Sequence, residues 1–148
     1  MTILDAYAVI AYLRDEPAAD PVRPLLEHGP RDLTAVGLAE VVDHLVRLSG
    51  ANEEDVVLDL AQLGLLDALP VNAAAGSAAG RLRARHYHRT RCPISMADAI
   101  AAETARSSGR ALATADPDLL NVCHAEGIRL LALPGSNGST WKAPTDPT

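Results

Sequence analysis

The chain has 148 residues, 48% of them hydrophobic, and a formal net charge of −6 at pH 7. This length is typical of one domain with one buried core, and the acidic balance argues against a broad electrostatic surface for nucleic acid. Two cysteines, Cys92 and Cys123, give neither a disulfide framework nor a paired Cys-x-x-Cys zinc motif. The first residues lack a basic start and reach Asp5 too early for a signal peptide or membrane span. We expect a cytoplasmic protein with no membrane partner.

Strand-like and helix-like segments alternate, which is typical of an α/β fold with a mainly parallel central sheet flanked by helices. In the first half the sequence predicts a strand at 2–4, helices at 7–14 and 20–28, a short strand at 32–36, and helices at 38–48 and from 52. In the second half it predicts a strand at 66–71, helices from 72 and from 95, a strand at 111–114, a helix at 116–126 and a strand at 128–133.

The end of the chain differs in composition from the rest. Gly, Ser, Asn, Pro and Thr dominate after residue 133, a composition that does not support a packed core. We therefore expect a single domain over residues 1–133 and a disordered tail over residues 134–148.

Two acidic residues come soon after predicted strands. Asp5 comes after the first strand and Asp116 after a later one, so both carboxylates are expected at the carboxyl edge of a parallel sheet, where open α/β folds bind ligands. Each residue also has a purely structural interpretation. Asp116 followed by Pro117 is a common helix start, and Asp5 is equally compatible with an ordinary turn.

A third acid lies near the start of a predicted helix. Asp98 follows Ser95 by three residues, as in a capping box. One helical turn further, its neighbours are Ala101 and Ala102, a small-residue face that lets a helix lie close to a sheet. A carboxylate on such a face is partly desolvated unless a positive group meets it, so a cation is a reasonable partner.

A fourth acid, Glu40, is weakly supported by the residues alone. Helical periodicity places it away from the apolar stripe of its helix and near three polar residues, Asp43, His44 and Arg47. Periodicity therefore predicts a solvent-exposed side chain at this position.

One short segment concentrates basic residues. Its five arginines are Arg81, Arg83, Arg85, Arg89 and Arg91, interleaved with His86, Tyr87 and His88. The segment is either an anion-facing patch or the solvated end of a helix. A zinc site built from His86, His88 and Cys92 would need a fourth ligand, such as Cys123 or His124, and its spacing is not diagnostic.

The four acids occur in short motifs that together resemble the PIN-domain ribonucleases, in particular the VapC-like toxins of bacterial toxin–antitoxin pairs. The matching motifs are Ile3-Leu4-Asp5-Ala6-Tyr7-Ala8, Leu38-Ala39-Glu40-Val41, Ser95-Met96-Ala97-Asp98-Ala99 and Ala113-Thr114-Ala115-Asp116. Their order and spacing are specific, and they span almost the whole chain before the tail.

The resemblance implies a PIN fold in which Asp5, Asp98, Asp116 and Glu40 form the catalytic and metal site. It also implies Mg²⁺- or Mn²⁺-dependent endoribonuclease activity, a cognate antitoxin protein and a homodimer. Carboxylates suit these hard, oxygen-preferring ions. We expect Asp5, Asp98 and Asp116 as direct or near ligands and Glu40 as a water-mediated ligand or general base.

Further residues take expected roles from this site. The hydroxyls of Thr114 and Ser95 are expected to orient the acids by hydrogen bonds. The predicted contacts to the RNA backbone are Arg81, Arg85, Arg89 and Arg91.

This chain departs from the family pattern at two positions. Many relatives have a small hydroxyl residue where this chain has Tyr7, and a polar residue where it has Gly37.

Other functions fit the sequence less well. A phosphotransfer domain with an aspartyl nucleophile usually needs a buried lysine, but Lys142 in the tail is the only lysine. The main alternative is a non-catalytic PIN-like module that binds RNA or a protein.

Overall fold

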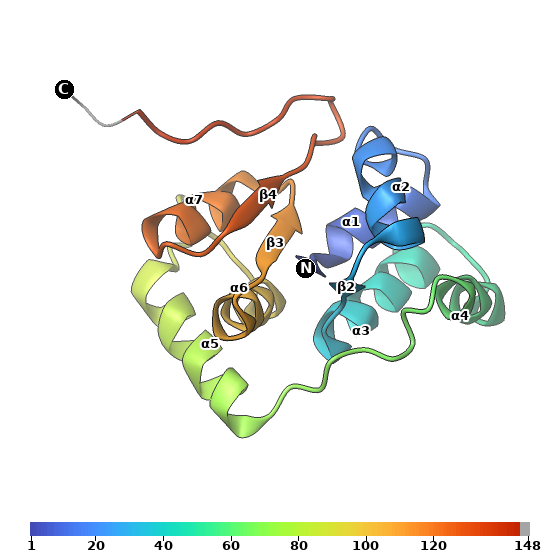
Figure 1. Ribbon diagram of the computed structural model, residues 1–148, viewed down its shortest axis with the longest axis horizontal. Helices are drawn as coiled ribbons and strands as arrows, with labels where there is room; N and C mark the ends of the chain where they lie inside the picture. Colours follow the sequence, from blue (N-terminus) through green and yellow to red (C-terminus); the bar gives the residue numbers. More distant parts are fainter. Residues whose placement is uncertain (146–148) are drawn as a thin grey trace.

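The computed structural model describes residues 1–145. Its sheet contains four strands in the order β2 (Arg31–Asp32), β1 (Thr2–Leu4), β3 (Ala111–Thr114) and β4 (Leu130–Ala132). Every neighbouring pair is parallel, and helices pack on both sides of the sheet (Figure 1). The predicted single-domain α/β fold with a parallel sheet is confirmed.

The helices form two groups that cover opposite faces of the sheet. One group consists of α1 (Ala6–Leu13), α2 (Ala19–His28), α3 (Ala35–Asp43), the π-helical turn η1 (His44–Leu48) and α4 (Glu53–Gln62). The other consists of α5 (Ala73–His86), α6 (Met96–Ser108) and α7 (Pro117–Ala125). Because successive strand residues point to opposite faces, Leu4 packs with the first group while its neighbour Ile3 packs with the second.

Two predicted strands differ from the structure, because local chemistry prevents further backbone pairing. The predicted strand at 66–71 is wrong, because only Leu69 forms a bridge, to Thr34. Pro70 follows it and has no N–H to extend a ladder. The predicted strand at 32–36 stops at Asp32, because the Thr34 hydroxyl accepts a hydrogen bond from the Gly37 N–H at 2.9 Å and begins α3.

Gly37, one of the two departures from the family pattern, has a packing role. It is buried in the first turn of α3, and a Cβ at this position would lie 2.8 Å from a side-chain carbon of Leu33. A larger residue would have to displace Leu33, itself only 1% exposed.

The described part of the predicted tail has contacts with the domain. Pro134 and Thr140 form an isolated antiparallel bridge, and the Trp141 indole N–H donates to the side chain of Asn121 at 2.9 Å. The domain boundary at residue 133 stays a prediction, and residues 146–148 of the predicted tail lie outside the described residues. Among residues 1–145, no helix has the length and apolar character needed to cross a membrane.

Candidate functional site

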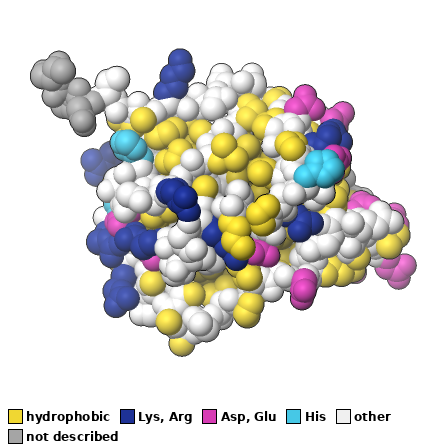
Figure 2. Space-filling model, in the orientation of Figure 1, with side chains coloured by type: hydrophobic (Ala, Val, Ile, Leu, Met, Phe, Trp, Pro, Cys, Tyr) yellow, Lys and Arg dark blue, Asp and Glu magenta, His cyan; other side chains and the backbone are white. Residues whose placement is uncertain are grey.

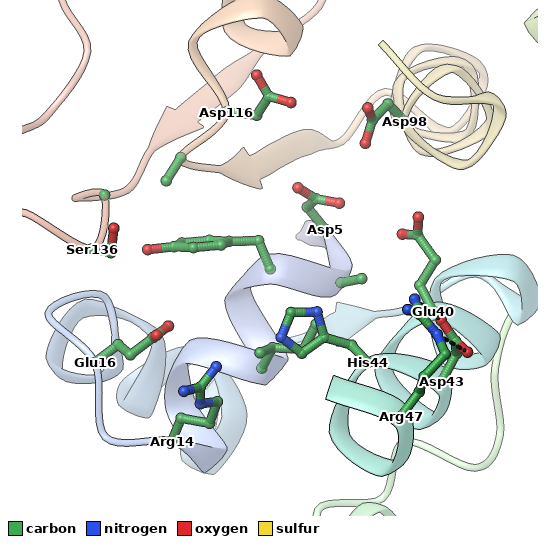
Figure 3. A pocket seen from close by; sticks show the side chains of 15 residues that line it. Asp5, Arg14, Glu16, Glu40, Asp43, His44, Arg47, Asp98, Asp116 and Ser136 are labelled. Atoms are coloured by element: carbon green, nitrogen blue, oxygen red, sulfur yellow. Dashed lines mark hydrogen bonds and ion pairs between the residues drawn. The ribbon is translucent and has the colours of Figure 1, made fainter. Parts of the chain in front are cut away.

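The four predicted acids line one pocket of about 620 Å³ (Figure 3). Asp5 follows β1 and Asp116 lies two residues beyond β3, and these strands are parallel neighbours, so their carboxyl ends meet at one edge of the sheet. Asp98 enters from the first turn of α6 and Glu40 from α3. The fold therefore brings together residues that are up to 111 positions apart in the sequence.

Thr114 connects the two acids at the sheet edge. Its buried hydroxyl donates to an Asp5 carboxylate oxygen at 2.7 Å and accepts from the Asp116 N–H at 3.1 Å. These bonds hold the Asp5 carboxylate and the start of α7 in a fixed relation, which is the orienting contact expected of Thr114.

Asp98 and Asp116 cap helices and line the pocket at the same time. Asp98 accepts from the Ser95 N–H at 2.8 Å while the Ser95 hydroxyl accepts from the Asp98 N–H at 3.0 Å, a complete capping box. Asp116 accepts from the Asp118 N–H at 2.9 Å at the start of α7. The capping and pocket interpretations of these acids are therefore compatible.

Helical periodicity predicts a solvent-exposed Glu40, and this prediction is wrong. Glu40 is half-buried, and Figure 3 shows its carboxylate extending into the same space as Asp5 and Asp98. The prediction fails because apolar periodicity identifies only the core side of a helix. The opposite, polar side of α3 faces a polar pocket and not bulk water.

The pocket disfavours negative charge. Burial, followed by repulsion from Asp98, raises the pKa of Asp5 to about 7, although the hydrogen bond from Thr114 opposes this rise. Burial also raises the pKa of Asp98 and of Glu40, with further repulsion from Asp116 and Asp98 respectively. Within residues 1–145, none of the four acids forms an ion pair. The site therefore carries negative charge that the protein does not neutralise.

The donor set fits a hard divalent cation held partly through water. All four groups are carboxylates, the donors that Mg²⁺ prefers, and Mg²⁺ usually keeps several of its waters. In the described residues, no three His, Cys, Asp or Glu side chains converge closely enough to hold one ion directly. A cation held by all four acids would therefore need contacts through water in addition to any direct ones.

Sequence reasoning missed the basic side of the pocket. Arg14 and His44 line it opposite Asp116 and Asp98 in Figure 3. Arg47 also lines it but is paired with Asp43 at 2.9 Å. A helical wheel offers the missing signal: Arg14 follows Tyr7 by two helical turns, and His44 follows Glu40 by one, so each pair shares a helix face.

The arginine segment lies outside the pocket. The described residues that line the pocket do not include Arg81, Arg85, Arg89 or Arg91. Arg85 is bound to Glu126 at 3.2 Å, as part of a cluster in which Arg106 and His86 contact the same carboxylate at 2.7 and 2.5 Å. Figure 2 shows Lys and Arg side chains gathered along the edge formed by α5 and α7. The role of these arginines in RNA binding stays a prediction. Arg85 would have to leave its ion pair with Glu126 to contact an RNA phosphate.

The alternative zinc site has no support in the described residues. His86 is engaged by Glu126, and the Nδ1 of His88 accepts backbone N–H groups of Thr90 and Arg91 at 3.2 and 3.1 Å. Burial raises the pKa of the Cys123 thiol to about 12, which disfavours the thiolate that zinc requires.

Solved structures of low sequence identity share this fold. The crystal structure of FitAcB from Neisseria gonorrhoeae is 20% identical, with a TM-score of 0.63 over 88% of this chain and 96% of that chain. A structure of FitAB bound to an IR36 DNA fragment is 21% identical, with a TM-score of 0.66 over 88% and 94% of the two chains. VapBC2 from Rickettsia felis, bound to a promoter DNA fragment, is 18% identical, with a TM-score of 0.59 over 88% and 96%.

The sequence itself matches a family model. No curated protein sequence matches the chain, but the model described as "PIN domain" matches residues 2–125, a range that includes all four acids. The strand order, the acids at the sheet edge and this match agree, and the chain belongs to the PIN-domain family.

Proposed function

We propose that this chain is a Mg²⁺- or Mn²⁺-dependent endoribonuclease that acts as the toxin of a toxin–antitoxin pair. The observation that carries the proposal is a pocket in which four carboxylates, held by different elements, have no ion-pair partner among the described residues. PIN domains are generally nucleases that use divalent metals, and this site has the charge and donor chemistry for that activity.

Asp5, Asp98 and Asp116 are the proposed residues that hold the cation. Their helix caps and the Thr114 hydrogen bonds restrict their rotamers before any ion arrives, and such preorganisation lowers the entropic cost of binding. A bound divalent ion would supply an acidified water and would neutralise charge on the phosphodiester.

Glu40 is the proposed proton acceptor. It lies across the pocket from Asp116 and, unlike the three aspartates, its carboxylate accepts no hydrogen bond recorded in residues 1–145. Burial raises the pKa of Glu40, which makes the carboxylate a stronger base than an exposed glutamate. It can therefore take the proton from an attacking water or orient that water through a hydrogen bond.

Partners follow from the same proposal. The structural neighbours include FitAB and VapBC2, which were solved on DNA fragments, and another is a toxin–antitoxin complex from Klebsiella pneumoniae. We propose a cognate antitoxin for this chain, a homodimeric form and a cytoplasmic location. Exposed apolar side chains on η1 and α4, namely Leu48, Val57 and Leu58, offer surface for a protein partner.

The test is cleavage of single-stranded RNA by the purified chain with Mg²⁺ or Mn²⁺, with chelator and with no metal. The proposal predicts internal cleavage that depends on the divalent ion and is suppressed by the co-purified product of a short reading frame immediately upstream. RNA binding without cleavage at any metal concentration would favour the non-catalytic PIN-like module.

A further inference from the structure

The turn formed by residues 134–140 borders the carboxylate pocket. Gly135 and Ser136 line the pocket, and Figure 3 shows Ser136 on the far side of the pocket from Glu40 and Asp98. The acids and this turn therefore face one another across a space large enough for part of a nucleotide chain.

The turn, which we call the C-terminal turn, is closed by its own backbone. The Gly135 N–H donates to the Ser139 carbonyl at 2.8 Å, and the Gly138 N–H donates to the Gly135 carbonyl at 2.8 Å. Gly138 has φ of 83°, a left-handed conformation that favours glycine. These bonds give the segment a defined shape, so its polar groups are presented at fixed positions.

Two contacts hold the turn against the domain, one at each end. At its start, the Tyr7 hydroxyl donates to the Pro134 carbonyl at 3.1 Å. Just beyond its end, the Trp141 indole N–H donates to Asn121 at 2.9 Å, and the indole meets the His124 ring edge-to-face with centroids 6.0 Å apart. The bulky Tyr7, which stands where many relatives have a small hydroxyl residue, thus lines the pocket and directs its hydroxyl to the start of the turn.

Ser136 of the turn and Arg14 both line the side of the pocket that lies opposite Asp98 and Glu40, and they offer hydrogen-bond donors there beside one carboxylate, Glu16. In residues 1–145, neither the backbone N–H nor the hydroxyl of Ser136 has a recorded hydrogen bond, and Arg14 forms no ion pair. Arg14 lines the same pocket. Backbone N–H groups, hydroxyls and Arg side chains are the donors that usually contact nucleic-acid phosphates.

We propose that the C-terminal turn is part of the substrate-binding site, where Ser136 contacts an RNA phosphate next to the one that is cut. Tyr7 and Asn121 are positioning residues that act through the turn. The carboxylates repel every phosphate that is not neutralised at the metal site, so a neighbouring phosphate needs donors on the opposite rim. This inference rests on the proposed ribonuclease function and adds a substrate-contacting segment to it.

The experiment uses the full chain and single-stranded RNA of mixed sequence with Mg²⁺. Asn121→Ala is the decisive variant, because Asn121 does not line the pocket and affects it only through Trp141. Tyr7→Phe removes one hydroxyl and keeps the ring. Tyr12→Phe is the matched control, because it removes a hydroxyl from the same helix that has no recorded hydrogen bond in the described residues.

Asn121→Ala and Tyr7→Phe should each raise KM about threefold to tenfold, the loss expected for one hydrogen bond, with kcat near that of the wild type. Ser136→Ala should do the same without loosening the turn. The single tryptophan, Trp141, reports docking directly. Its quenching by acrylamide should increase in Asn121→Ala and Tyr7→Phe, stay unchanged in Tyr12→Phe, and decrease when RNA binds the wild type.

Wild-type KM in both Asn121→Ala and Tyr7→Phe, despite increased Trp141 quenching, would overturn the inference, because the turn would then move without affecting substrate binding. A fall in kcat alone would also overturn it. Absence of cleavage by the wild type would instead defeat the proposed function. In that case contact between the turn and bound RNA would be supported if RNA shields Trp141 from acrylamide, and rejected if it does not.

Discussion

Acidic side chains occupy two contrasting environments in this protein. In the pocket, Asp5 is 7% exposed and has no cationic partner among the described residues, and its pKa rises to about 7. At the junction of α5, α6 and α7, Glu126 is contacted by Arg106, His86 and Arg85. These contacts, with that of Arg106 the largest, lower the pKa of Glu126 to about 2.

The difference separates a carboxylate that the fold neutralises from carboxylates that it leaves without a charged partner. Glu126 is neutralised within the fold and ties the ends of three helices together, so the protein needs no ligand there. The pocket acids are also ordered, but only by hydrogen-bond donors that carry no full charge. Their mutual repulsion lowers the stability of the metal-free protein, and the proposed cation would relieve it.

The largest expected effect is the loss of cleavage in Asp98→Asn. The substitution removes the charge that holds the cation but keeps an oxygen that can accept the Ser95 N–H, so the capping box survives. Metal-dependent cleavage should fall by about a hundredfold or more. Asp118→Asn is the control, because Asp118 does not line the pocket. Steady-state rates with Mg²⁺ measure both, and a wild-type rate in Asp98→Asn would remove Asp98 from the site.

The next largest effect is the pH dependence of metal-free stability. Asp5 has a higher pKa in the folded state than its ordinary value of 3.8, so the folded state binds more protons. Its contribution is fully present below about pH 4 and is lost as pH rises through about 7. The loss amounts to about 4 kcal/mol. Urea unfolding with chelator at several pH values should show this fall, and Asp5→Asn should flatten it. An unchanged profile in Asp5→Asn would contradict the raised pKa.

Glu126 should behave in the opposite way. Its lowered folded-state pKa means that its contribution is present above about pH 4.5 and is lost as pH falls through about 2. Glu126→Gln should cost about 1–2 kcal/mol at pH 7, because Arg85 and Arg106 lose their common anion and His86 loses its charged hydrogen-bond partner. Thermal unfolding followed by circular dichroism gives the measurement. Glu27→Gln, on the exposed face of α2, serves as the control. Equal losses of stability in the two variants would show that the contacts of Glu126 stabilise the fold no more than an exposed glutamate does.

The smallest effect concerns the exposed arginines. Arg89 and Arg91 form no ion pair recorded in residues 1–145 and follow α5 in a tight turn closed between His88 and Cys92. Replacing both with Ala should weaken RNA binding a few-fold and reduce the salt slope by about 0.7 per lost phosphate contact. Arg85→Ala is unsuitable for this comparison, because it also breaks the contact with Glu126. Fluorescence anisotropy over a salt series measures the slope, and an unchanged slope would make this segment a solvated surface.

The sheet edge was predictable because its signals are local. An acid within two residues of the end of a buried strand predicts the positions of Asp5 and Asp116. Ser95 followed three residues later by Asp98 predicts a capping box. Glu40 was identified only by resemblance, because a polar residue gives the same periodicity whether it faces water or a polar pocket.

The missed features depend on contacts between distant residues. The strand predicted at 66–71 reduces to one bridge at Leu69, because Pro70 cannot continue the pairing. The composition of the chain after residue 133 indicates disorder, but it carries no information on single long-range bonds such as the one from Tyr7 to Pro134. Arg14 and His44 are isolated basic residues in the sequence, unlike the dense arginine segment, and only the fold places them together at the pocket.

The most direct test of a functional charge in the pocket is the effect of divalent ions on thermal unfolding. At pH 7, Mg²⁺ at ten times its dissociation constant should stabilise the wild type by about 1.4 kcal/mol, or roughly 3–6 °C in Tm. Circular dichroism should show this rise with Mg²⁺ and with Mn²⁺, and a much smaller rise in Asp98→Asn. Little change is expected near pH 4, where protons compete with the cation for the three acids of raised pKa, Asp5, Asp98 and Glu40. An unchanged wild-type Tm at pH 7 at every concentration up to several millimolar would contradict a cation site.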